Sequence, residues 1–137
     1  MSLDLPNDPT APGVARQTVR RTLTSWHLPA LVDNAVLAVS ELVTNAVRHG
    51  LPPLGLRLSK RASQVRMDVS DARADGLPTA GRSADDDESG RGLSIIKAVS
   101  DQSGSEHIPG DGKNVFASWD LSTEDVDTAA SLPRKDP

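Results

Sequence analysis

Residues 30–49 constrain the fold of this chain more than any other segment, because their apolar side chains recur with helical spacing. On a helical wheel of about 100° per residue, one side of this segment is apolar throughout, with Leu42 at its edge. Asn34, Glu41 and Asn45 fall within roughly 40° of one another on the other side. The apolar side consists of Val32, Ala35, Val36, Val39, Val43, Ala46 and Val47. The segment is therefore predicted to be a core helix with a row of oxygen-bearing side chains facing away from the core.

Glycine and proline residues mark the ends of the predicted elements. Gly50 suits a left-handed cap at the end of this helix, and the Leu-Pro-Pro sequence at residues 51–53 prevents its continuation. The other predicted elements are a short strand at residues 3–5, a helix from Thr10 or Pro12 to about Trp26, a hairpin of strands at residues 54–59 and 65–70 joined by five residues, a helix from Gly90 to about Gln102, and strands at residues 105–108 and 115–121 with a turn at residues 109–113 between them. Helices on one face of a mostly antiparallel sheet make an α+β fold, a two-layer α/β sandwich.

The composition fits one domain with a single core, since the chain has 137 residues, of which 36% are hydrophobic and 25% charged. We expect residues 1–9 to be an extended segment, residues 10–121 to form the domain, and residues 122–137 to be a disordered tail. Periodicity is lost between residues 72 and 89. A loop of this length inside a domain is usually a lid, a binding loop or disorder.

Charge and composition argue against several classes of function. A net charge of −4 gives no general attraction to nucleic acid or anionic lipid, and 2% aromatic residues provide no platform for stacking bases. With no cysteine, the chain cannot form disulfides, Cys-ligated zinc sites or a thiol nucleophile. Neither a signal-peptide pattern nor an apolar run of the roughly 20 residues that span a membrane is apparent. We therefore expect a cytoplasmic protein that binds neither nucleic acid directly nor membranes.

Two polar positions next to predicted core elements are candidates for a site. Glu41 and Asn45 lie one helical turn apart, which could serve a metal–phosphate site, although a solvated helix face explains such a pair more often. Asp71 directly follows the second hairpin strand and precedes the long loop. Ligands often bind at such places, but aspartate at a strand end is also ordinary turn chemistry.

A third candidate is the sequence Gly90-Arg91-Gly92-Leu93 at the start of a predicted helix. Glycines there let backbone N–H groups approach a phosphate, and the helix dipole favours its negative charge. A hinge without a ligand is an equally good explanation. The sequence Gly112-Lys113-Asn114 is not a P-loop, because the residue after the lysine lacks a hydroxyl group.

The combination of these features is more specific than any one of them. Glu41-Leu-Val-Thr-Asn45-Ala, then Asp71 after a strand, then a loop that ends in Gly90-Arg-Gly-Leu, resembles the ATPase domains of the gyrase, histidine kinase and MutL (GHKL) superfamily. More narrowly, it is similar to the anti-sigma-factor serine kinases. The resemblance covers roughly residues 10–121 and implies a Bergerat-type ATP-binding fold.

The resemblance also implies a role for each candidate. Asn45 would coordinate Mg²⁺ at the phosphates of ATP, and Glu41 would be the general base that accepts a proton from the attacking hydroxyl. Asp71 would accept a hydrogen bond from the adenine amino group. The sequence Gly90-Arg91-Gly92-Leu93 would frame the phosphates at the end of a lid. Gly76 is displaced by one position from a glycine of the family's Asp-x-Gly-x-Gly motif, where this chain has Asp71-Ala-Arg73-Ala-Asp75.

The activity that follows from this resemblance is an ATP-dependent protein serine kinase. It would phosphorylate a small antagonist protein, release it, and then sequester a sigma factor, and a homodimer is expected. The altered glycine motifs, together with a final hairpin that lacks the threonine of a Gly-x-Gly-Thr element, leave an alternative open. The same fold could act as a binding module with little or no catalysis. Plain ATP hydrolysis is a third possibility, but the sequence offers no further domain to transmit a conformational change.

Overall fold

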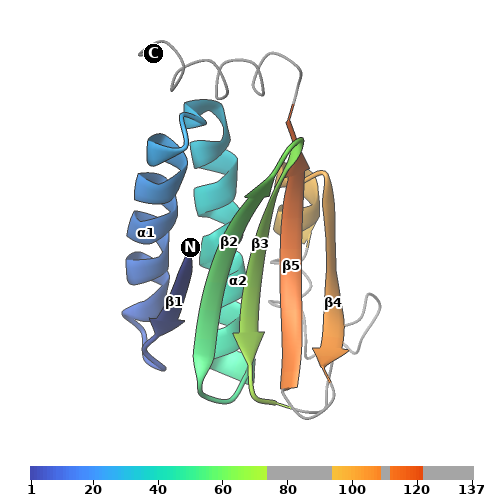
Figure 1. The fold of residues 1–137 in the computed structure, drawn as a ribbon. Coiled ribbons are helices and arrows are strands. Elements are labelled where there is room, and N and C mark those ends of the chain that lie inside the picture. The colour runs from blue at the N-terminus through green and yellow to red at the C-terminus, as the bar shows by residue number, and fades with distance from the viewer. Residues whose placement is uncertain (74–93, 109–111, 122–137) are drawn as a thin grey trace.

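The computed structural model describes residues 1–73, 94–108 and 112–121. In this part of the chain, one open antiparallel sheet has helices on a single face (Figure 1). The predicted two-layer α+β sandwich is therefore confirmed. Across the sheet the strands follow the order β1 (Ser2–Leu5), β2 (Leu54–Arg61), β3 (Gln64–Asp71), β5 (Gly112–Asp120) and β4 (Gln102–Ile108). The predicted lid positions Gly76, Gly90, Arg91, Gly92 and Leu93 lie outside the described residues, as does the tail at 122–137.

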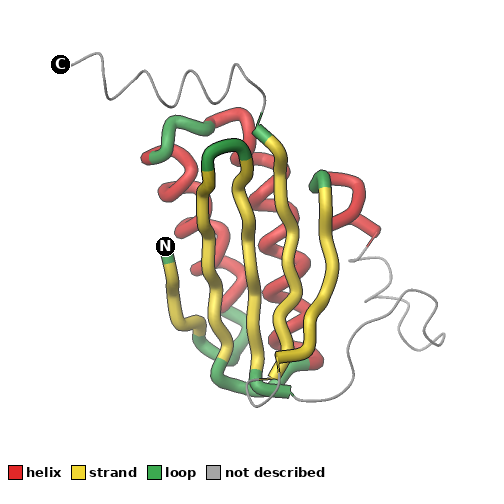
Figure 2. Tube along the Cα trace, turned by 45° about the vertical axis from the view of Figure 1, so that its right-hand side comes forward, coloured by secondary structure: helices red, strands yellow, loops and turns green. Residues whose placement is uncertain are grey.

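Three helical segments cover the sheet side by side (Figures 1 and 2). The first is α1 (Ala11–Ser25), and the second is α2 (Val32–His49), which a short 3₁₀ turn, η1 (Pro29–Leu31), precedes. Residues 94–99 are helical and lie on the other side of α2 from α1. The third helix was expected to reach about Gln102, but Gln102 is the first residue of β4, so this helix ends earlier. From Gln102 on, the backbone pairs with β5 instead of continuing the helix.

Local hydrogen bonds fix both ends of α1. Before the helix, Asp8 accepts hydrogen bonds from the Thr10 hydroxyl and from the Thr10 backbone N–H, the latter at 2.8 Å. These bonds, with the hydroxyl contributing most, lower the pKa of Asp8 below its usual value. After the helix, His27 takes a left-handed φ of 62°, and the Leu28 N–H donates to the Leu23 carbonyl at 2.9 Å. This pattern closes the helix and turns the chain toward α2.

Helix α2 is the central element of the core. Its buried residues follow the predicted apolar stripe and include Ala38 as well, while Val36 and Val47 are partly buried. By length and composition the segment Pro29–His49 could cross a membrane, with a mean hydropathy of 1.3. In this fold, however, the apolar stripe packs against α1 and the sheet, which makes the segment a core helix.

The expected left-handed cap at Gly50 is wrong. Gly50 is extended, with φ −90° and ψ −176°. A Cβ atom at this position would lie 2.6 Å from Cγ of Asp71 and 2.7 Å from the Ala46 carbonyl oxygen. Glycine is therefore required here because the end of α2 approaches the end of β3 closely. The backbone of Gly50 does not adopt a conformation that only glycine favours.

The strands are longer than the sequence pattern indicates. Strands β2 and β3 leave only Ala62 and Ser63 between them, where a five-residue connection was expected. Strand β5 begins at Gly112, three residues before its predicted start at Val115. The ladder with β3 extends to the pair Asp71–Lys113, so Lys113 belongs to a strand, although it was assigned to a turn.

Candidate functional site

Asp71 lies at the end of β3, where the sheet meets the end of α2. Its side chain is 3% exposed, and one carboxylate oxygen, Oδ1, accepts two backbone hydrogen bonds. The donors are the N–H groups of Arg73 at 2.8 Å and Leu51 at 3.4 Å. The Ala72 N–H in turn donates to the Leu51 carbonyl at 2.8 Å. The chain after β3 is thus tied to the chain after α2, and the carboxylate is held between them.

Two glycines make room for Asp71, one next to its carboxylate and one next to its backbone. Gly50 faces its carboxylate, as described above, and Gly112 lies against its backbone. Gly112 has φ +97°, and a Cβ there would come within 2.1 Å of the Asp71 carbonyl oxygen. A side chain at either position would displace Asp71, so the two glycines are part of what positions this carboxylate.

Arg73 occupies a position where the family motif has a glycine, and it has a structural use. Its guanidinium Nη1 donates to the backbone carbonyl of His49 at 2.7 Å. That carbonyl is the last of α2, where the helix dipole favours a cation. Arg73 therefore links the end of β3 to the end of α2 with its side chain, while its backbone N–H donates to Asp71.

Glu41 and Asn45 lie on the flank of α2 that faces away from α1. The α1 flank is marked by Ser40, whose hydroxyl accepts a hydrogen bond from Arg16 Nη1 at 3.2 Å. On the helix surface Asn45 is about 20° from the buried Ala38, on the opposite flank. The helical residues 94–99 also lie on the other side of α2 from α1 (Figure 2).

The exposure of this polar row changes along α2. Asn34 is exposed, whereas Glu41 and Asn45 are half-buried. Within the described parts of the chain, neither Glu41 nor Asn45 makes a side-chain hydrogen bond or an ion pair. A half-buried carboxylate and amide without partners can accept or donate hydrogen bonds to a ligand.

The structure brings the C-terminal half of α2 and Asp71 to one side of the domain. With a rise of about 1.5 Å per residue, Asn45 lies about 7 Å and Glu41 about 13 Å before Gly50 along the helix axis. Gly50 contacts Asp71, so the three candidate side chains follow one another in the order Asp71, Asn45, Glu41. An elongated ligand anchored at Asp71 could extend along α2 past the other two.

A charged residue beside Asp71 was not predicted from the sequence. Lys113 is directly opposite Asp71 in the ladder between β3 and β5, and its Nζ is 3.9 Å from Oδ2. Its side chain is only 8% exposed. Lys113 follows Gly112 at the place where the family's Gly-x-Gly-Thr element has threonine. The available signal was the alternation of β5, which puts Lys113 on the same face as the buried Ala117 and Trp119.

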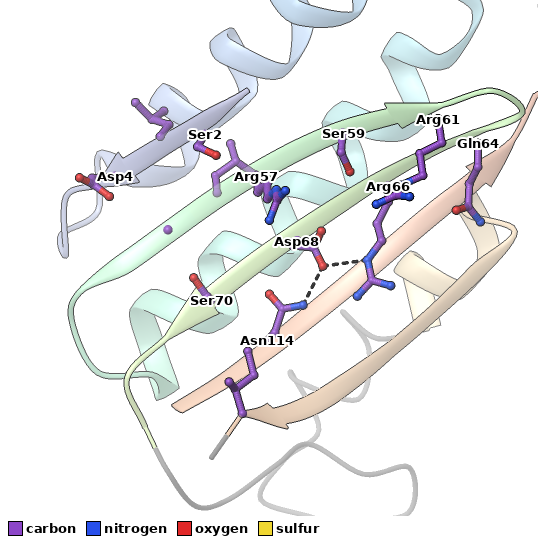
Figure 3. Close-up of a pocket in the computed structure, with 14 residues that line it drawn as sticks. Ser2, Asp4, Arg57, Ser59, Arg61, Gln64, Arg66, Asp68, Ser70 and Asn114 are labelled. Atoms are coloured by element: carbon purple, nitrogen blue, oxygen red, sulfur yellow. Dashed lines mark hydrogen bonds and ion pairs between the residues drawn. The ribbon is translucent and has the colours of Figure 1, made fainter. Parts of the chain in front are cut away.

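A separate cavity of about 650 Å³ lies on the other face of the sheet and contains none of the predicted site residues (Figure 3). Asp68 is at its centre and accepts hydrogen bonds from Arg66 at 2.9 Å and from Asn114 at 2.7 Å. Arg66 also pairs with Glu106 and lies over the ring of Phe116. Because Asn114 points to this face, its side chain does not take the place of the missing threonine next to Asp71.

The fold agrees with a comparison against known families. The profile of the histidine kinase-like ATPase domain matches residues 5–119, which is most of the chain. The chain therefore belongs to this family of ATP-binding domains. No curated protein matches the sequence.

The oxygen-bearing side chains of Glu41, Asn45 and Asp71 are too few to hold a metal ion by themselves. They fit a nucleotide whose phosphates supply the other metal ligands. No group of three or more His, Asp or Glu side chains in the described residues could hold a metal ion. Mg²⁺ usually takes one or two protein oxygens and completes its shell with phosphates and water. The unpartnered amide of Asn45 could supply one such oxygen, and Oδ2 of Asp71 could accept a hydrogen bond from a base.

Proposed function

We propose that this chain is a cytoplasmic ATP-dependent protein serine kinase of the anti-sigma-factor type. The observation that carries the proposal is the half-buried, unpartnered pair Glu41 and Asn45, aligned along α2 with the buried carboxylate of Asp71. Family membership supports ATP as the ligand. The substrate would be a serine of a small antagonist protein.

In this proposal each side chain has one task. Asp71 Oδ2 accepts a hydrogen bond from the adenine amino group, and Asn45 would hold Mg²⁺, which would neutralise phosphate charge. Glu41 accepts the proton of the serine hydroxyl as its oxygen forms a bond to the γ-phosphorus, and ADP leaves when the bridging P–O bond breaks. Such transfer depends mainly on positioning and charge neutralisation, so a small site suffices.

Partner exchange would follow from the product. A phosphoserine adds a charge of about −1.5 to −2, which disfavours a packed interface and would release the antagonist. The freed kinase would then bind a sigma factor, and a homodimer is the assembly that we expect. If Asn45 and Glu41 do not support transfer, the alternative is a binding module of the same fold that acts by sequestering its partner.

The metal role of Asn45 can be tested by calorimetric titration. Asn45→Ala is expected to remove most of the difference between ATP affinities measured with Mg²⁺ and with EDTA, because the amide oxygen no longer contributes a ligand. The matched control is Asn34→Ala, which removes an exposed amide from the same helix. Equal Mg²⁺ dependence in the Asn45 variant and in the wild type would refute the ligand role.

A further inference from the structure

Lys113 is a buried cation at the candidate base-binding end of the site. Directly opposed residues of an antiparallel pair have side chains on the same face of the sheet. Lys113 and Asp71 are opposed in this way, and their face is the one that α2 covers. The two side chains are 8% and 3% exposed. Taking an ammonium group out of water has a large cost unless it is paired and hydrogen-bonded.

The contact between Lys113 and Asp71 leaves both groups with unused capacity. Their separation of 3.9 Å exceeds the usual 2.7–3.2 Å of a hydrogen bond, so Nζ has a charge partner without donating to it. Both hydrogen bonds that Asp71 accepts within the described residues go to Oδ1, so Oδ2 keeps its capacity to accept one. An acceptor and a donor group therefore lie side by side, facing α2.

We infer that Lys113 is a specificity-determining residue that reads the purine ring beside Asp71; this inference rests on the proposed function. Adenine has an amino donor next to ring nitrogens that accept hydrogen bonds. Oδ2 of Asp71 accepts from the amino group, and Nζ of Lys113 donates to the adjacent ring nitrogen. The lysine thus adds a second contact to the base, through a charged donor.

The same pair disfavours guanine. Guanine could reverse the pattern, with its carbonyl oxygen on Lys113 and its ring N–H on Oδ2. Its 2-amino group would then need a further acceptor, but Oδ1 already accepts from the backbone of Leu51 and Arg73. A buried donor without a partner weakens binding by about 10- to 100-fold. ATP is therefore expected to bind more tightly than GTP by about this factor.

The test is a set of titrations of the full chain with ATP, GTP, 1-deaza-ATP and 7-deaza-ATP. Each deaza analogue lacks one ring nitrogen next to the amino group. Lys113→Met should lower the affinity for ATP by about 10- to 100-fold, as expected for the loss of a charged hydrogen bond. The control Lys60→Met removes an exposed lysine from β2 and should leave the affinity unchanged. One deaza analogue should bind the wild type more weakly, and Lys113→Met should cause no further loss for that analogue.

The outcomes separate this inference from the proposed function. If Lys113→Met leaves the relative affinities of all four nucleotides unchanged, Lys113 only neutralises Asp71 and the inference is wrong, while ATP binding stands. Equal affinity of the wild type for GTP and ATP would also overturn it. If the wild type binds no ATP, the proposed function and the inference both fail. Should Lys113→Met not fold, Lys113→Gln keeps N–H donors without the charge, and its binding should show a smaller loss for the same nucleotide.

Discussion

Replacing Glu41 by alanine is expected to abolish phosphate transfer while ATP binding stays nearly intact. General-base catalysis contributes about 10²- to 10⁴-fold to such reactions, and nothing else on this flank of α2 within the described residues offers a carboxylate one turn from Asn45. Transfer is measured with γ-labelled ATP and a serine-containing antagonist protein, and binding by calorimetry.

Asp33→Ala is the matched control for Glu41→Ala, because it removes an exposed carboxylate from the first turn of the same helix. It should leave transfer unchanged. Wild-type rates of transfer in the Glu41 variant would remove Glu41 as the base. Loss of ATP binding together with transfer would instead indicate a role in holding the nucleotide.

Gly112→Ala is expected to have the largest effect on stability. The new Cβ would lie 2.1 Å from the Asp71 carbonyl oxygen, and φ +97° is unfavourable for any residue with a side chain. Backbone strain and overpacking together should lower the free energy of unfolding by about 3 kcal/mol. Urea unfolding, followed by circular dichroism, measures this change.

Gly13→Ala provides the comparison for Gly112→Ala. Gly13 lies in the first turn of α1, and a Cβ there would meet only Nη2 of Arg16 at 3.7 Å. Alanine should be tolerated at this position or slightly stabilising, since it favours helix more than glycine does. Equal midpoints for Gly112→Ala and the wild type would show that Gly112 is not constrained by Asp71.

The sequence was sufficient to predict what depends on local periodicity. The apolar stripe of α2, the start and end of α1 and the alternation of β2 and β3 each follow from residues close together in the chain. These patterns predicted the layer architecture, and they located Glu41 and Asn45 on a polar flank. The position of Asp71 between a strand and a long loop made it a candidate, and the structure finds it buried at the end of β3, next to the end of α2.

What could not be predicted depends on contacts between distant segments. Gly50 looked like a helix cap, but its real constraint comes from Asp71, which is 21 positions further along the chain. Arg73 looked like a departure from a glycine motif, but its side chain caps α2. Lys113 was assigned to a turn because its pairing with Asp71 depends on the register between β3 and β5.

These contacts bear on the choice between a kinase and a binding module. Arg73 and Lys113 both differ from the family pattern, yet each has a defined partner at the Asp71 end of α2. Neither Arg73 nor Lys113 donates a hydrogen bond to Oδ2 of Asp71. Among the described residues, neither is a partner of Glu41 or Asn45. This arrangement favours a site that binds nucleotide over one that has lost the capacity.

The central claim is that Asp71 and α2 form the wall of an ATP site, and the most direct measurement is a calorimetric titration of the wild-type chain with ATP, with and without Mg²⁺. We predict saturable binding that Mg²⁺ strengthens and that Asp71→Ala abolishes. No detectable binding at millimolar ATP in the presence of Mg²⁺ would contradict the claim and favour a binding module that works without nucleotide.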